Sequence, residues 1–121
     1  MQTEAGKIKK MKLKTLALIP TRLNSTRLPA KALLPINNIP LIMHVYKRTL
    51  LAKKVDEVII CCDDKKIFNI VKKYDAKVVM TSKHHPNGTD RICEAFKKIK
   101  DRNKYNLVVD IQGDEPLVSP V

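Results

Sequence analysis

Four short apolar runs, each separated from the next by a stretch with helical spacing, constrain the fold more than any other feature. The runs cover residues 13–19, 55–62, 77–80 and 106–111. Between them, apolar residues recur at the three- and four-residue spacing of an amphipathic helix. Regular alternation of strand and helix is typical of an open, mostly parallel sheet covered by helices. The sequence therefore predicts an α/β fold.

Proline and short polar residues mark where the predicted helices begin. Pro40 precedes a helix that we expect to run to about residue 53. Its predicted buried stripe consists of Leu41, Ile42, Val45 and Leu50. Asp63 is suited to cap the second helix, and Thr89 or Asp90 the third. The prolines spread through residues 20–39 exclude a continuous helix there.

The length of 121 residues suits one domain with its own core. Residues 1–12 are polar, lysine-rich and unpatterned, and we expect a disordered basic leader ahead of one folded unit over residues 13–121. No run approaches the roughly 18 apolar residues of a membrane helix, and no apolar stretch precedes a signal-cleavage site. We therefore expect a cytoplasmic protein with no membrane-spanning part.

The three cysteines are Cys61, Cys62 and Cys93, and none has zinc-ligand spacing to another. Neighbouring residues of a strand point to opposite faces, so Cys61 and Cys62 would not readily bond each other. We expect three reduced thiols with structural roles.

The net charge of +12 admits two interpretations. Lysines spread along every predicted helix are typical of a solvated surface, whereas a polyanionic partner would exploit the excess charge. The few aromatic residues are not interleaved with basic ones, as a base-stacking platform requires. Nucleic-acid binding is therefore the weaker alternative. A phosphate-bearing small molecule is favoured because some basic residues gather in one loop.

Three predicted loops follow the carboxyl ends of strands, and all three have unusual chemistry. They are residues 20–39, 81–90 and 112–116. In open parallel sheets, ligands bind outside these ends, near the point where the strand order reverses. The sequence therefore predicts a ligand site at this edge.

The first loop carries Arg22, Arg27 and Lys31. The arginine fork matches phosphate oxygens, and lysine supplies a movable point charge. Ser25 and Thr26 would add neutral donors. The loop lacks the glycines of a P-loop, so its spacing alone leaves two interpretations open, a triphosphate cradle and an ordinary surface loop with scattered cations.

The second loop contains Gly88, which would let the backbone approach a ligand closely, ahead of a helix start that favours anionic or polar groups. His84 and His85 lack the further convergent ligands of a metal site, and we expect both to be exposed loop residues.

A carboxylate pair, Asp114 and Glu115, follows the fourth strand. A carboxylate at this place is well suited to hold Mg²⁺ together with substrate phosphates. Gly-Asp-Glu-Pro is also good turn chemistry, so a metal site and a simple turn both remain open.

Taken in order and with their spacing, these segments resemble the 3-deoxy-manno-octulosonate (Kdo) cytidylyltransferases, the CMP-Kdo synthetases of lipopolysaccharide synthesis. The resemblance covers the chain from about Leu16 to its last residue. It is carried by residues 19–22, 25–31, 40–42, 44–46, 80–81, 85–86, 88–91 and 112–116.

The resemblance implies a Rossmann-like α/β fold with helices on both faces of a mostly parallel sheet. It also implies a Mg²⁺-dependent, homodimeric enzyme that converts CTP and Kdo to CMP-Kdo and pyrophosphate. The anomeric hydroxyl of the sugar acid would attack the α-phosphorus in line. Such chemistry depends on positioning and charge stabilisation.

The family pattern also implies roles for residues of the basic loop and the acidic turn. Arg22, Arg27 and Lys31 would hold the triphosphate, with Ser25 as a neutral donor. Asp114 would ligate Mg²⁺. Arg22, Lys31 and Asp114 would thereby carry the catalytic charge stabilisation.

The base and ribose would lie against a second set of residues, again by resemblance. Thr21, Gln112 and the loop around Asn87 and Gly88 would surround cytosine and ribose. Arg91 would support that loop.

This chain departs from the family pattern in three ways. Asn87 replaces the serine of the family's Ser-Gly-Thr and keeps the glycine, Gly88. Ala30 stands where the family has glycine, which costs about 1 kcal/mol if the position needs a positive φ. Family members are also longer, and their further part would supply the sugar pocket and a second metal carboxylate. We therefore expect the nucleotide-binding half of such an enzyme. The alternatives are a sialic-acid-type cytidylyltransferase and a non-catalytic basic fragment, either nucleic-acid-binding or decayed.

Overall fold

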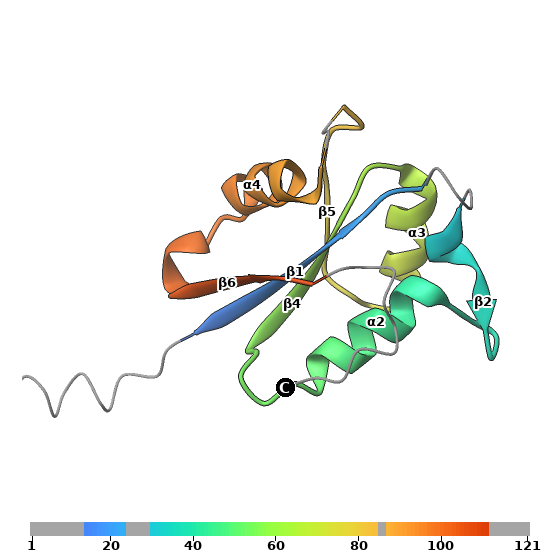
Figure 1. The fold of residues 1–121 in the computed structure, drawn as a ribbon, viewed down its shortest axis with the longest axis horizontal. Helices are drawn as coiled ribbons and strands as arrows, with labels where there is room; N and C mark the ends of the chain where they lie inside the picture. Colours follow the sequence, from blue (N-terminus) through green and yellow to red (C-terminus); the bar gives the residue numbers. More distant parts are fainter. Residues whose placement is uncertain (1–13, 24–29, 85–86, 112–121) are drawn as a thin grey trace, which may run out of the picture.

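A computed structural model describes residues 14–23, 30–84 and 87–111 of the chain. The predicted leader, residues 1–12, lies outside this part. Within it, the elements alternate along the chain as the apolar runs indicate (Figure 1).

Four parallel strands form the central sheet, in the order β5-β4-β1-β6. Their bounds are Thr15–Thr21 for β1, Glu57–Cys62 for β4, Val78–Met80 for β5 and Leu107–Asp110 for β6. Each lies within two residues of its predicted run, because parallel strands buried on both faces appear in the sequence as continuous apolar segments. The predicted mostly parallel sheet is confirmed.

Helices cover both faces of this sheet. The connection from β1 to β4 contains α2 (Leu41–Leu50), and that from β4 to β5 contains α3 (Lys65–Lys73). These two pack on one face, whereas α4 (Gly88–Lys98), between β5 and β6, packs on the other (Figure 1). The chain therefore changes face at the boundary between β1 and β6.

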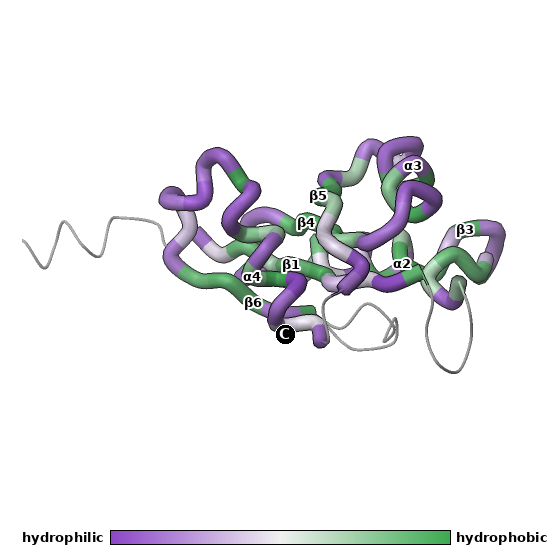
Figure 2. The backbone as a smooth tube through the Cα atoms, turned by 90° about the horizontal axis from the view of Figure 1, so that it is seen from above, coloured by the Kyte–Doolittle hydropathy of each residue, from purple (hydrophilic) through white to green (hydrophobic). Residues whose placement is uncertain are grey.

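The core is divided into two layers by the alternation of strand side chains. Ala17 and Ile19 pack on the side of α2 and α3, and Leu16 and Leu18 on the side of α4. Figure 2 shows much of the strands in hydrophobic green and much of the turns and of α4 in hydrophilic purple. Among the described residues, no helix is both long enough and apolar enough to cross a bilayer.

The cysteines of β4 follow the same alternation. Cys62 belongs to the layer under α2 and α3, and Cys61 to the layer under α4. Burial raises the pKa of Cys61 to about 12 and that of Cys62 to about 11. All three cysteines are free thiols, with Cys93 exposed, and the predicted placement of Cys61 and Cys62 on opposite faces of the strand is confirmed.

The predicted helix caps are displaced by one to three residues. The cap of α3 is Asp64, whose Oδ1 accepts a hydrogen bond from the Lys66 amide at 2.7 Å, and not Asp63. The cap of α4 is Asn87, whose Oδ1 accepts one from the Asp90 amide at 2.9 Å. Both caps have extended backbone, as a residue entering a helix requires.

The first connection differs from the sequence prediction in its detail. A 3₁₀ turn, η1 (Lys31–Leu33), and a hairpin of β2 (Pro35–Ile36) and β3 (Ile39–Pro40) precede α2. Asn37 and Asn38 turn the hairpin with φ values of 52° and 66°, which asparagine tolerates better than most residues. The exclusion of a continuous helix from residues 20–39 is borne out in the described part.

Helix α2 is shorter than predicted, but most of its predicted stripe is confirmed, since Leu41, Ile42 and Val45 are buried. It ends at Leu50, not near residue 53, and Leu50 is 48% exposed. Met43 and Thr49 are also buried, and the Thr49 hydroxyl donates to the Val45 carbonyl at 2.8 Å. That bond satisfies a hydroxyl inside the core, so a polar residue occupies the place predicted for leucine.

Candidate functional site

The described beginnings of the predicted site segments lie at the carboxyl edge of the sheet. Strand β1 is flanked by β4 and β6, and the connections that lead away from β1 and into β6 lie on opposite faces. This arrangement is a topological switch point, the usual ligand site of open α/β sheets. The strand order thus places the ends of β1 and β6 beside each other, as a nucleotide site at this edge requires.

Thr21 and Arg22 lie at the end of β1. Thr21 is buried, and its hydroxyl donates to the Ile19 carbonyl at 3.3 Å. The hydroxyl oxygen is left with acceptor capacity only. Arg22 is exposed at the rim, where a guanidinium can reach an anionic ligand at little desolvation cost.

Two backbone hydrogen bonds close the base of the first loop. The Leu23 amide donates to Asp63 Oδ1 at 3.0 Å, and the Ala30 amide donates to the Leu23 carbonyl at 2.6 Å. Arg22 directly precedes Leu23 and Lys31 directly follows Ala30, so the Leu23–Ala30 hydrogen bond holds the backbone of both cations close together. Ser25 and Arg27 lie outside the described residues.

Ala30 adopts the left-handed conformation, with φ of 58° and ψ of 28°. The position therefore does need a positive φ, and the conditional cost expected for alanine applies. This strained residue lies where the chain leaves the loop and enters η1, and its amide donates a hydrogen bond back to the Leu23 carbonyl.

The start of α4 packs directly on the end of β1. A Cβ placed on Gly88 would lie 3.3 Å from Cγ of Pro20, closer than nine in ten such contacts. Gly88 thus fits a close approach to β1 and has no positive φ. Asn87 uses its carbonyl oxygen as the helix cap. Whether either residue also contacts a ligand stays a prediction.

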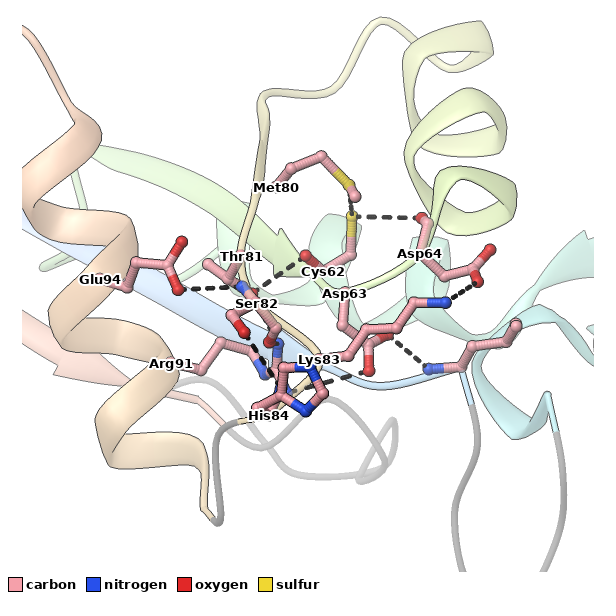
Figure 3. A network of polar contacts seen from close by, with 11 residues as sticks. Cys62, Asp63, Asp64, Met80, Thr81, Ser82, Lys83, His84, Arg91 and Glu94 are labelled. Carbon is pink, nitrogen blue, oxygen red and sulfur yellow. Dashed lines mark hydrogen bonds and ion pairs between the residues drawn. The ribbon is translucent and has the colours of Figure 1, made fainter.

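Arg91 is the largest fully buried side chain in the described part of the chain, only 1% exposed. Its Nη1 donates to the Thr81 hydroxyl at 2.6 Å and to the Ser82 carbonyl at 2.8 Å. Its Nη2 lies 3.9 Å from Oδ2 of Asp63 and has no hydrogen-bond partner among the described residues. Figure 3 shows this network between α4, the segment after β5 and the end of β4. Arg91 therefore supports the start of the 81–90 loop.

Asp63 is the member of the network that the sequence prediction missed. It was expected to be a helix cap, but its carboxylate bridges the Leu23 amide and the Arg91 guanidinium. The doublet with Asp64 was the available signal, because only one of two adjacent residues can cap a given helix. The other carboxylate follows directly after a buried strand and is therefore available for contacts at the carboxyl edge of the sheet.

Exposed groups complete the described part of this edge. Asp64 pairs with Lys83 at 3.4 Å, and the hydrogen bond from the Lys66 amide lowers the pKa of the Asp64 carboxyl. Glu94 accepts from the Ser82 amide at 2.9 Å. His84 is exposed, as expected for a loop histidine, whereas His85 lies outside the described residues.

The comparisons with known proteins identify the family of the chain. The sequence profile of the cytidylyltransferases matches residues 16–121. The chain belongs to this family. The match begins at the second residue of β1, so it includes the whole described carboxyl edge of this cytidylyltransferase chain.

Individual relatives carry more specific names. The chain is 45% identical to a 3-deoxy-manno-octulosonate cytidylyltransferase of Thermodesulfovibrio yellowstonii, with 86% of the chain and 42% of the relative covered. It is 44% identical to an 8-amino-3,8-dideoxy-manno-octulosonate cytidylyltransferase of Shewanella frigidimarina, with 90% and 44% covered. The chain thus spans less than half the length of either relative.

A solved structure has the same fold over the described region. It is that of CMP:2-keto-3-deoxy-manno-octonic acid synthetase complexed with CTP, 38% identical, with a TM-score of 0.81. The alignment covers 88% of this chain and 43% of that one. The Rossmann-like fold implied by the sequence resemblance is therefore confirmed for this cytidylyltransferase chain.

The predicted metal and base contacts on the acidic turn lie outside the described residues, namely Gln112 and Asp114. The Ile111 amide donates to the Leu18 carbonyl at 3.0 Å, which keeps the chain beside β1 up to the point where that turn begins. Within the described part, no group of three or more His, Cys, Asp or Glu side chains is placed to hold a metal ion.

Proposed function

We propose that this chain is the nucleotide-binding half of a CTP-dependent enzyme that transfers a cytidylyl group to a Kdo-type sugar acid. The observation that carries the proposal is the switch point, where the basic loop leaves β1 beside the end of β6. The relatives named above act on such sugar acids according to their names, and one related structure holds CTP. The three free cysteines fit a reducing compartment, and we assign the activity to the cytoplasm.

In this proposal the described residues bind and orient the nucleotide. Arg22 and Lys31, on either side of the Leu23–Ala30 hydrogen bond, would meet the triphosphate with a fork and a point charge. The start of α4 would lie beside the ribose and base. The proposed transfer needs no covalent enzyme intermediate, because its rate depends mainly on positioning of the reactants and on charge stabilisation.

Magnesium would be shared between the protein and the phosphates. Mg²⁺ prefers one or two carboxylates together with phosphate oxygens. We propose Asp114 as the carboxylate, by resemblance. The ion would neutralise charge on the triphosphate. Asp114→Asn is expected to abolish the Mg²⁺-dependent part of CTP binding in calorimetry, and unchanged binding would contradict the assignment.

Pyrophosphate release tests the complete activity. The chain is incubated with CTP, Kdo and Mg²⁺, alone and with the C-terminal part of the Thermodesulfovibrio yellowstonii relative as a second polypeptide. We expect release when both polypeptides are present, because that relative is more than twice as long as the matched region. No release in either mixture would contradict the catalytic proposal.

The acceptor within this class is a separate question. The relatives named for Kdo and for its 8-amino analogue match with nearly equal identity, 45% and 44%. Both sugar acids are therefore acceptors of the proposed class. Competition among Kdo, its 8-amino analogue and N-acetylneuraminate in the complemented reaction would assign the acceptor. A preference for N-acetylneuraminate would favour the sialic-acid alternative.

A further inference from the structure

A single buried carboxylate connects two segments of the proposed nucleotide site. Asp63 Oδ1 accepts a hydrogen bond from the Leu23 amide at 3.0 Å, and the Leu23 carbonyl in turn accepts one from the Ala30 amide. This bond is the link between the end of β4 and the base of the loop that contains Arg22 and precedes Lys31. The position of that base depends on where the Asp63 carboxylate is held.

Arg91 holds the other side of the same carboxylate. Its Nη2 is 3.9 Å from Asp63 Oδ2, while its Nη1 is fixed by the Thr81 hydroxyl and the Ser82 carbonyl. Thr81 is itself anchored on β4, since its amide and hydroxyl donate to the Cys62 carbonyl at 2.8 and 3.0 Å. The guanidinium is thus a rigid, buried cation that orients the carboxylate (Figure 3).

The two oxygens of the Asp63 carboxylate serve two different segments. Oδ1 accepts the hydrogen bond from the Leu23 amide, whereas Oδ2 faces Nη2 of the buried Arg91. Nη2 has no hydrogen-bond partner among the described residues, and its attraction to Asp63 offsets part of the cost of burying it. A change at Asp63 therefore acts on the loop base and on Arg91 together.

We propose that Asp63 is a positioning residue of the nucleotide site. Through the Leu23 amide it sets the base of the phosphate loop, and through Arg91 it ties that base to the segment that leads to Asn87 and Gly88. The proposal rests on the proposed function for its ligand. Its structural part, the tie between Asp63 and the loop base, is testable without any ligand.

Two substitutions of Asp63 and one matched control define the experiment. Asp63→Ala removes both contacts, and Asp63→Asn keeps an oxygen for Leu23 but loses the charge that faces Arg91. The control, Asp64→Asn, makes the same charge change one residue later and keeps a good helix cap. Amide hydrogen exchange is measured by peptide, together with CTP affinity by calorimetry.

The proposal predicts a local and graded effect. Exchange in the peptide over residues 19–33 rises in the order wild type, Asp63→Asn, Asp63→Ala, while strands β4 and β6 stay protected. CTP affinity falls in the same order, by about tenfold or more for the alanine variant. Asp64→Asn leaves exchange at 19–33 as in the wild type, so a rise in that peptide is specific to Asp63.

Other outcomes distinguish failure of the positioning role from failure of the proposed function. Exchange that rises equally in all segments, or not at all, overturns the positioning role, and a folded Asp63→Asn decides this if Asp63→Ala fails to fold. If the wild-type chain binds no CTP but residues 19–33 respond as predicted, the tie stands and the proposed function fails. If CTP affinity is the same in wild type and Asp63→Ala, the positioning role is wrong although the function stands.

Discussion

Each of the two edges of the sheet contains a carboxylate paired with basic side chains, but the two clusters differ in burial. At the carboxyl edge, Asp63 faces an arginine that is 1% exposed. At the amino edge, Glu57 pairs with Lys77 and Lys104, each at 3.3 Å, and accepts a short hydrogen bond from the Tyr105 hydroxyl. The side chains of these lysines are 62% and 37% exposed.

The cavity at the amino edge is open and basic. It has a volume of about 310 Å³, and its lining includes Glu57, Tyr105 and several lysines. Water solvates these lysines whether or not they pair, so each contributes little to stability. The cluster around Asp63 has no such freedom, because breaking a buried pair leaves a buried charge behind. Burial, and not the number of charges, therefore decides which cluster can fix the position of a loop.

Removing one cation from each edge gives the largest contrast. Arg91→Met would leave Asp63 without its buried counter-charge and is expected to lower the free energy of unfolding by about 3–5 kcal/mol. Lys104→Met at the amino edge is expected to cost less than about 1 kcal/mol. Urea denaturation of both variants measures the difference. Equal losses would break the distinction between the two edges.

Asn87 tests whether a predicted ligand residue is mainly a helix cap. Asn87→Ala removes the bond to the Asp90 amide and is expected to cost about 1 kcal/mol, whereas Asn87→Asp keeps the cap and the stability. Thermal unfolding follows both variants. If Asn87→Asp is as stable as the wild type but binds CTP more weakly, the side chain has a ligand role in addition to its cap.

Ala30 tests the strain in the base of the loop. Ala30→Gly would relieve the left-handed conformation, which costs an alanine about 1–2 kcal/mol, but the glycine gains entropy in the unfolded chain. We expect a net gain of about 0.5 kcal/mol in unfolding free energy. Ala32→Gly, in the adjoining 3₁₀ turn and without a positive φ, is the control and should lose stability. If both variants are less stable than the wild type, the left-handed conformation of Ala30 does not cost the expected free energy.

Glu57 is expected to give the smallest effect, and one that depends on pH. The hydrogen bond from Tyr105, followed by those from Lys104 and Lys77, lowers the pKa of the Glu57 carboxyl below its ordinary 4.5. A lowered pKa in the folded state means stability that is present above pH 4.5 and lost as the pH falls through the folded value.

Glu57→Gln should therefore cost less than about 1 kcal/mol at pH 7. The gap to the wild type should close as the pH is lowered below 4.5. Urea denaturation at several pH values checks this. A gap that stays constant with pH would mean that the charge of Glu57 does not contribute.

The strands were predictable because strands buried on both faces appear in the sequence as continuous apolar runs. Runs such as Leu16 to Ile19 have no exposed face, so each residue is apolar regardless of which layer it joins. The helix caps were less predictable, since Asp63 and Asp64 are equally good capping residues and only the end of β4 decides between them. The two-residue strands of the β2–β3 hairpin are too short for any apolar period to appear.

The candidate site was predictable in place and chemistry but not in its connections. Arg22 and Lys31 stand out because basic residues gather in one loop after a buried strand. The pairing of Asp63 with Arg91 has no local signal, because the two residues are distant in sequence and meet only when β4 and α4 pack. Gly88 was linked to a ligand, but its visible neighbour is Pro20.

Hydrogen exchange of the wild-type chain with and without CTP and Mg²⁺ tests the central claim most directly, because it reads both edges of the sheet at once. Nucleotide binding at the carboxyl edge predicts slower exchange in residues 19–33, 63–66 and 81–91, with residues 72–77 and 100–105 at the amino edge unchanged. Protection confined to the amino edge, or no protection at saturating CTP, would contradict the account.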